Sequence, residues 1–258
     1  MWRGCAVIAS YAGFAWCAAI AGCATPQVVP IDAPVIFEIL ASSADPFVVE
    51  LADQFVPFGR TDAWQIVNGR GQATNDSPFQ CISSPTNSYD AQWMLLSIGG
   101  DREFISQGVG GELALRAVES PHDDAISIFT PPLMFAAGTM SMGEVRHATS
   151  AMRVEWVDGR GERDRGTGER TARVVGAVRI RTPLGEFDTM KVETAFEARL
   201  RFATAQRDTT LWITRGLGPI VEQWRERVFV MGVPISNEAG TAVRIATIPL
   251  ERTTKVPE

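Results

Sequence analysis

Alternating apolar and polar side chains predict a long β-strand over residues 190–202. One parity is almost wholly apolar and comprises Met190, Val192, Thr194, Phe196, Ala198, Leu200 and Phe202. The other parity is mostly charged, with Lys191, Glu193, Glu197, Arg199 and Arg201. A period of two residues places one set on the buried face of a sheet and the other in water. We therefore expect Met190, Val192, Phe196, Leu200 and Phe202 to form either a core or a ligand-facing surface.

The preceding residues extend this strand into a β-hairpin. Residues 174–181 alternate more loosely, and the segment TPLGE at 182–186 supplies the Pro and Gly that a tight turn favours. A flat strand of residues 190–202 would span about 44 Å. Because this is roughly twice the usual length of a strand, the sheet must twist and coil around its core.

Further apolar segments follow at short intervals, separated by turn residues. We expect strands at 64–67, 92–98, 102–107, 112–118, 126–129, 144–157, 211–213, 220–230 and 241–248. This spacing predicts a mainly β fold: a long-stranded, curved antiparallel sheet, an open or closed barrel-like meander, with at most one or two short helices.

Three segments are less regular. Asp45 followed by Pro46 suits the start of a short helix that ends near Phe55, although Val48-Val49 equally suits a strand. The dipeptide at 131–132, Pro-Pro, is expected to close the strand at 126–129. The charged, Gly-rich residues 158–170 are expected to form a solvated connection.

The N-terminus has the pattern of a bacterial lipoprotein signal. Arg3 precedes an apolar stretch that ends in Ile20-Ala21-Gly22-Cys23, which is similar to a lipobox. In a lipobox the signal is cut before the cysteine, and its thiol carries a diacylglycerol. We expect lipidation at Cys23 and stable anchoring by its acyl chains. A plain transmembrane helix is the alternative for this span.

This pattern gives a domain organisation and a location. We expect a signal peptide at 1–22, an acylated Cys and Pro-rich tether with a short helix at 23–60, one β domain at 61–250 and a tail at 251–258. Ala24 follows the cysteine, which by the enterobacterial sorting rule favours the outer membrane facing the periplasm. Cys5 and Cys17 leave with the signal, so the remaining thiol, Cys81, has no disulfide partner and is expected to be a small buried residue.

The amino-acid composition argues against nucleic acid as a partner. The chain has a formal net charge of −6 and no block of basic residues, whereas nucleic-acid binding uses clustered Lys and Arg.

Catalytic and metal-binding patterns are absent from the sequence. There is no G-x-S-x-G elbow, and His122 and His147 are its two histidines. Met134, Met140 and Met142 have the thioethers that bind Cu(I), but core packing is the preferred interpretation. We therefore predict no metal site, no cofactor and no enzyme activity.

Turn motifs carry a family resemblance. They are FVPFG at 55–59, DAW at 62–64, FTPPL at 129–133, TPLGEF at 182–187 and WITRGLGPIV at 212–221. Their order resembles that in a large group of uncharacterised bacterial envelope proteins, over roughly residues 64–230, whose shape is similar to the LolA/LolB and LppX lipoprotein-carrier fold. The resemblance implies a curved antiparallel sheet and a helical lid around an apolar cavity for acyl chains.

Two functions follow from these observations. The first is a lipid-anchored, non-catalytic envelope protein that binds an apolar or lipid-like ligand on the concave side of its sheet. The alternative is a structural or assembly lipoprotein that has a filled core and acts through protein partners in the envelope.

Overall fold

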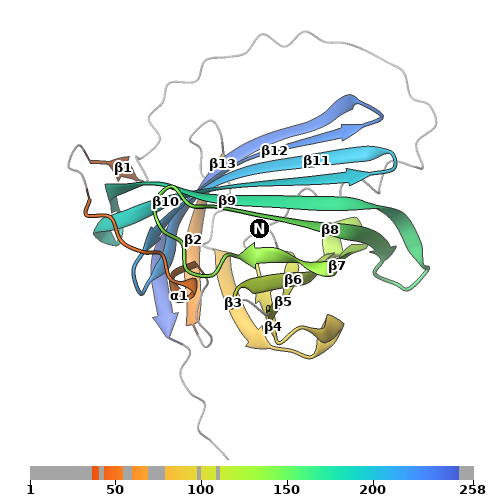
Figure 1. Ribbon diagram of the computed structural model, residues 1–258, viewed down its shortest axis with the longest axis horizontal. Coiled ribbons are helices and arrows are strands. Elements are labelled where there is room, and N and C mark those ends of the chain that lie inside the picture. Colours follow the sequence, from red (N-terminus) through yellow and green to blue (C-terminus); the bar gives the residue numbers. More distant parts are fainter. Residues whose placement is uncertain are drawn as a thin grey trace, which may run out of the picture.

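A computed structural model describes residues 37–40, 44–54, 60–68, 79–97, 100–108 and 111–249. The predictions for the signal peptide, Cys23, the Pro-rich tether and the C-terminal tail fall outside these ranges. Within them the chain is mainly β, and its strands form one curved antiparallel sheet (Figure 1). The predicted fold class is therefore confirmed.

The strands are longest in the C-terminal half. Their bounds are β1 (Glu38–Ile39), β2 (Arg60–Asn68), β3 (Phe79–Pro85), β4 (Trp93–Leu96), β5 (Arg102–Gln107), β6 (Leu113–Ser120), β7 (Ala125–Ala136), β8 (Val145–Trp156), β9 (Glu162–Thr182), β10 (Gly185–Leu200), β11 (Ala203–Thr214), β12 (Gly218–Val230) and β13 (Val233–Pro249). The described helices are α1 (Leu51–Gln54) and two single 3₁₀ turns, Ser88–Asp90 and Pro121–Asp123. None of these helices is long and apolar enough to cross a membrane.

The sheet curls back on itself. Its strand order is β1-β9-β10-β11-β12-β13-β2-β3-β4-β5-β6-β7-β8, and β8 also pairs with β9. Neighbours are therefore consecutive along most of the chain, as in a meander, and β13 pairs with β2 to join its two ends. Because the sheet curls, bulk water reaches its inner face less freely than its outer face.

The hairpin of β9 and β10 is the longest pairing in this sheet. Its register runs from Gly185 opposite Thr182 to Leu200 opposite Gly166, with one shift between Lys191 and Val192. β9 begins at Glu162, so the prediction of a solvated connection over residues 158–170 was wrong for most of that segment. The reason is that β9 pairs with β8 on one side and with β10 on the other over the same Gly-rich residues.

Strand β7 continues through the two prolines that were expected to end it. The β7–β8 pairing stops at Thr130, and the β6–β7 pairing passes from Ile128 directly to Leu133. Proline has no N–H to give to a ladder, so the ladder omits these residues while the strand direction is kept. The prediction that the strand closes there was wrong.

Residues 44–54 lie across one opening of the sheet. Val49 forms an isolated antiparallel bridge with Met140. The helix α1 follows, and Gln54 Nε2 donates to the carbonyl oxygens of Ala137 and Gly138, each at 2.7 Å. Asp53 Oδ1 accepts a hydrogen bond of 2.6 Å from the Gly216 amide. Both interpretations of this segment hold in part: it contains a strand-like bridge and one short turn of helix.

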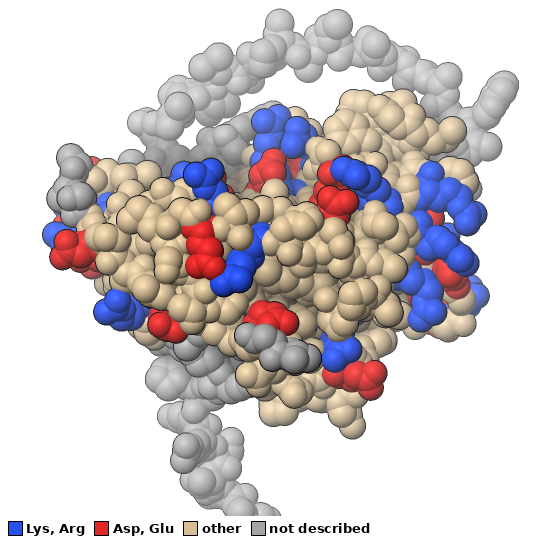
Figure 2. Space-filling view, viewed as in Figure 1, with Lys and Arg blue, Asp and Glu red and all other residues tan. Residues whose placement is uncertain are grey.

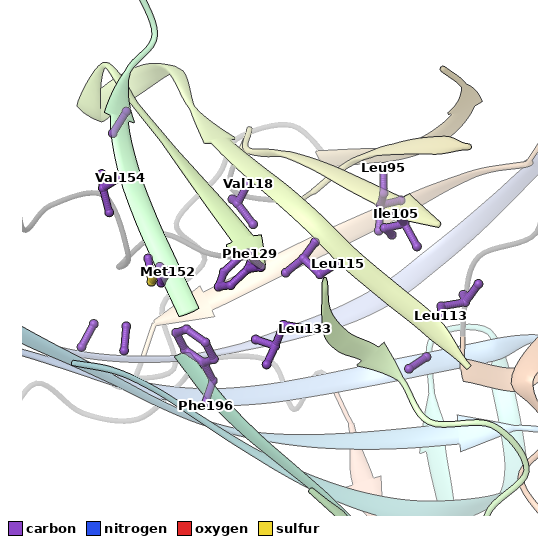
Figure 3. Packing of buried hydrophobic residues seen from close by; sticks show 14 of the residues in the cluster. Leu95, Ile105, Leu113, Leu115, Val118, Phe129, Leu133, Met152, Val154 and Phe196 are labelled. Atoms are coloured by element: carbon purple, nitrogen blue, oxygen red, sulfur yellow. The ribbon is translucent and has the colours of Figure 1, made fainter. Parts of the chain in front are cut away.

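The main core lies between the inner faces of the two halves of the sheet. Figure 3 shows Phe196 of β10 pointing toward Phe129 of β7 and Met152 of β8. Leu115 and Leu133 of the same cluster are fully buried, at 0% exposure. Side chains of strands that are distant in sequence thus fill one end of the interior.

A glycine near the start of β9 permits the double pairing of this strand. A Cβ at Gly166 would collide with the carbonyl oxygen of Arg199 on β10, whereas a Cβ at Gly176, on the same strand, would have no atom within 4 Å. The close approach at Gly166 therefore requires the absence of a side chain.

We expect Gly166→Ala to lower the free energy of unfolding by about 1–3 kcal/mol, because β9 must move away from β10 to accept the methyl group. Gly176→Ala is the matched control and should change it by less than about 0.5 kcal/mol. Urea unfolding followed by circular dichroism measures both. Equal stability of the two variants would contradict the close approach at Gly166.

Candidate functional site

The inner face of the sheet encloses a cavity of about 140 Å³. Its wall combines side chains of the short helix and of most strands. They are Gln54, Trp64, Leu95, Ser97, Glu103, Phe135, Ala136, Ala137, Arg170, Ala172, Val192, Thr194, Phe196, Arg207, Thr209, Leu211, Ile213, Pro219 and Glu222. The wall is apolar over one part and charged over another.

The five residues that the sequence proposed as core or ligand-facing differ in their surroundings. Met190 is 0% exposed, and Val192 and Phe196 are also buried. Val192 and Phe196 line the cavity. Leu200 is half-buried and packs against the main core.

Phe202 does not share this inner face. Its side chain is 59% exposed. Strand β10 ends at Leu200, so the alternation stops there, and Phe202 lies in the turn that leads to β11. Side chains alternate between the two faces only where the chain forms a strand. The prediction therefore wrongly included Phe202, which lies two residues beyond the end of β10.

The three methionines considered as copper ligands do not line the cavity. Met134 and Met140 are buried in a second apolar cluster, whereas Met142 is 52% exposed. The backbone of Cys81 belongs to β3, and its side chain is not among those described. Across the described residues, no three His, Cys, Asp or Glu side chains are grouped to hold a metal ion.

A row of charged side chains crosses the inner face at Phe196. Phe196 is paired with Arg170 of β9 on one side and with Arg207 of β11 on the other. Arg207 is paired in turn with Glu226 of β12. Antiparallel pairing places directly opposed residues on the same face, so two guanidinium groups flank a buried aromatic ring.

Arg207 is held by two buried carboxylates. Its Nη2 lies 3.2 Å from Glu222 Oε1, and its Nη1 lies 3.2 Å from Glu226 Oε2. All three side chains are at most 10% exposed. Burial raises the pKa of Glu222 and of Glu226, and the positive charge of Arg207 opposes this rise. The cluster thus consists of one buried guanidinium group and two buried carboxyl groups that both contact it.

Arg170 has different surroundings, because no carboxylate of the described residues forms an ion pair with it. Its guanidinium carbon lies 5.5 Å from the centroid of the Phe135 ring. Its Nη1 is buried and has no hydrogen-bond partner among the described residues. Burial lowers the pKa of Arg170, and the charges of Glu103 and Glu222 oppose this shift. A hydrogen-bond donor therefore lies unused in the wall of the cavity.

The outer face of the same strands carries ordinary surface ion pairs. Lys191 Nζ lies 3.0 Å from Glu193, and Arg199 Nη2 lies 2.9 Å from Glu197. Acidic and basic side chains lie interspersed on the face seen in Figure 2. Such exposed pairs contribute little to stability, so the functional interest lies in the buried charges.

Sequence reasoning missed the buried charges, although a signal was present. Arg207 interrupts the inward parity of β11, which otherwise contains Ala203, Ala205, Thr209, Leu211 and Ile213. Arg170 and Glu222 interrupt the inward parities of β9 and β12 in the same way. A charge at an inward position of an otherwise apolar parity indicates either a buried pair or a binding site.

Comparison with known proteins gives only distant likenesses. No family model matches the chain, and no curated protein matches it. Among solved structures it is similar to the hypothetical lipoprotein YmcC from Escherichia coli, at 11% identity over 75% of this chain and 91% of that one, with a TM-score of 0.36. A protein from Bacteroides fragilis, proposed to be exported and to have a YmcC-like fold, is 10% identical over 76% and 98%, with a TM-score of 0.40.

A third solved structure is that of a proposed lipoprotein from Parabacteroides distasonis. It is 10% identical over 76% of this chain and 98% of that one, with a TM-score of 0.34. Identities and TM-scores this low assign no function to the chain. The resemblance to the LolA/LolB and LppX carriers stays a prediction.

We expect Arg207→Met to lower the free energy of unfolding by about 3–5 kcal/mol at neutral pH, because it leaves Glu222 and Glu226 buried without a cation. The raised pKa values mean that the folded state binds these protons more tightly than the unfolded state. The resulting stabilisation is present below the unfolded pKa and is lost as pH rises through the folded pKa. The destabilisation of the variant should therefore shrink in acid.

Urea unfolding from about pH 4 to about pH 8 measures this dependence. Arg199→Met, which removes two exposed ion pairs, with Glu169 and Glu197, is the control and should cost less than about 1 kcal/mol at every pH. A small loss for Arg207→Met that does not change with pH would contradict the buried cluster.

Proposed function

We propose that this chain is a lipid-anchored, non-catalytic protein of the bacterial cell envelope, and that it holds an apolar or lipid-like ligand in the cavity inside its curled sheet. The observation that carries this proposal is the cavity itself. Protein interiors are normally packed to the density of organic crystals. Here a space of about 140 Å³ remains beside a well-packed core.

The wall of the cavity suits an acyl chain. Phe135, Ala172, Val192, Leu211 and Ile213 contribute apolar surface from four strands. Burial of a methylene group against such surface stabilises a complex by about 0.8 kcal/mol. Pockets that bind small molecules combine such a wall with a few polar groups, as this one does.

The anchor is proposed from the sequence around Cys23. The apolar stretch and the motif Ile20-Ala21-Gly22-Cys23 favour acylation at this thiol. An acylated protein stays at a membrane surface, where lipid-like molecules are available, and Ala24 favours the outer membrane as its location.

One surface feature favours the alternative, an assembly role through a protein partner. The turns at one end of the sheet expose Phe202 at 59%, Met231 at 80% and Val233 at 61%. The Met231 amide donates a 2.8 Å hydrogen bond to the Phe202 carbonyl, so the two turns are adjacent. Clustered apolar side chains on a surface are typical of contact sites.

We expect Cys23→Ala to abolish incorporation of radiolabelled palmitate in growing bacteria, because it removes the thiol that would carry the acyl chains. Cys17→Ala lies within the predicted signal and should leave incorporation unchanged. Palmitate on the Cys23→Ala protein would contradict lipidation at this residue.

We expect an octyl chain that carries a terminal diazirine to label peptides from β9, β10 and β11 when the full chain is irradiated in lipid discs prepared without detergent. Ala172→Leu fills the cavity and should reduce this labelling about tenfold, since it displaces about two methylene groups. Ala195→Leu adds the same side chain on the exposed face and serves as the control. Mass spectrometry of the peptides measures the labelling, and equal labelling of both variants would contradict ligand binding in the cavity.

A further inference from the structure

Among the described residues, three groups that line the cavity and can donate a hydrogen bond have no hydrogen-bond partner. They are Nε1 of Trp64, Oγ of Ser97 and Nη1 of Arg170. Each of these atoms is buried. Trp64 and Ser97 are 2% and 3% exposed as whole side chains. A buried donor without an acceptor costs about 1–3 kcal/mol, so native structures rarely leave several facing one space.

All three groups can donate a hydrogen bond. The indole N–H and the guanidinium N–H can only donate, and the serine hydroxyl can donate as well as accept. They come from separate parts of the chain, namely β2, the end of β4 and β9. A ligand that satisfies all three must therefore bring acceptor oxygens.

The charge of the wall excludes a strongly charged ligand. Its ionisable groups are the guanidinium groups of Arg170 and Arg207 and the carboxyl groups of Glu103 and Glu222. Glu226 also contacts Arg207 from the side. Two guanidinium groups thus stand against three carboxyl groups, so a buried anion would add to the negative charge of this set and would be uncompensated, even though Arg170 itself has no ion pair among the described residues.

We propose that the cavity binds an uncharged amphiphile whose head group carries acceptor oxygens, such as an acyl ester of glycerol, and that Trp64, Ser97 and Arg170 donate to that head group. This inference rests on the proposed ligand-binding function and adds the class of ligand. The acyl chain lies against Val192, Leu211 and Ile213 on the apolar part of the wall.

The size of the cavity limits how much of the ligand is enclosed. A cavity of about 150 Å³ in another protein holds one benzene molecule. The space of about 140 Å³ here therefore encloses the head group or a few carbons. The remainder of a longer acyl chain extends through the opening.

The test is a competition experiment on the full chain in lipid discs, with the octyl diazirine probe described above. Unlabelled monooctanoylglycerol and octanoate are compared as competitors, because they share the acyl chain and differ in the charge of the head. We expect monooctanoylglycerol to displace the probe about tenfold better, because the carboxylate of octanoate would bring an uncompensated charge into this wall.

Variants locate the head group. Arg170→Met should weaken displacement by monooctanoylglycerol about tenfold, and Trp64→Phe, which deletes the indole N–H, should weaken it about threefold. Arg173→Met changes an exposed arginine on the same strand and should leave both competitors unchanged. Circular dichroism reports folding, and if Arg170→Met does not fold, then Trp64→Phe and Ser97→Ala decide the question.

The possible results distinguish a failure of ligand binding from a failure of the proposed head group. If the probe labels no cavity peptide, ligand binding itself is wrong. If the probe labels the cavity but octanoate competes as well as monooctanoylglycerol, or displacement by monooctanoylglycerol is unchanged in Trp64→Phe, Ser97→Ala and any folded Arg170→Met, then ligand binding stands and the proposed head group is overturned.

Discussion

The structure depends on strand β9 pairing with two neighbours over the same residues. Residues 166–173 are opposed by β10 on one side and by β8 on the other. This double pairing turns a long meander into a curl with an inner face. Gly166 permits it, because no side chain fits between β9 and the Arg199 carbonyl. Without the curl, the inner charges of β9, β11 and β12 would lie in water and would have no special role.

Burial in the curl gives those charges their energetic importance. Arg207 is matched by Glu222 and Glu226, so its charge is balanced within the protein. A buried ion pair of this kind rarely adds net stability compared with apolar residues of the same size. The presence of the cluster in an interior that could have been apolar is therefore better explained by a requirement of the cavity than by stability. Arg170, with an unused buried donor, fits the same explanation.

Alternation of side chains was sufficient to predict the mainly β fold, because a half-buried strand imposes a period of two residues on its sequence. Met190, Val192 and Phe196 lie on the inner face for this reason. Tertiary contacts limited the prediction elsewhere. Phe202 follows the end of β10 and is exposed, and the residues after Glu162 form a strand only because two neighbours pair with them.

The candidate site was harder to predict, because it depends on which strands meet across the interior. Arg170 and Arg207 are separated along the chain, and only the registers of β9, β10 and β11 place them on either side of Phe196. Trp64 reaches the same cavity through the pairing of β13 with β2. No local sequence pattern indicates that these residues lie close together across the interior. The interruption of an apolar parity by a charge does report that a site exists.

Strand β10 faces a filled core along one part and a cavity along another. Met190 and Ala198 are packed on all sides, at 0% exposure, while Val192 and Phe196, which lie between them, also line the cavity. A sheet that served only as a scaffold would gain from larger side chains at Ala172 or Thr194, which border the empty space. Small residues and unused donors that line the same space agree with our proposal that the cavity holds a ligand.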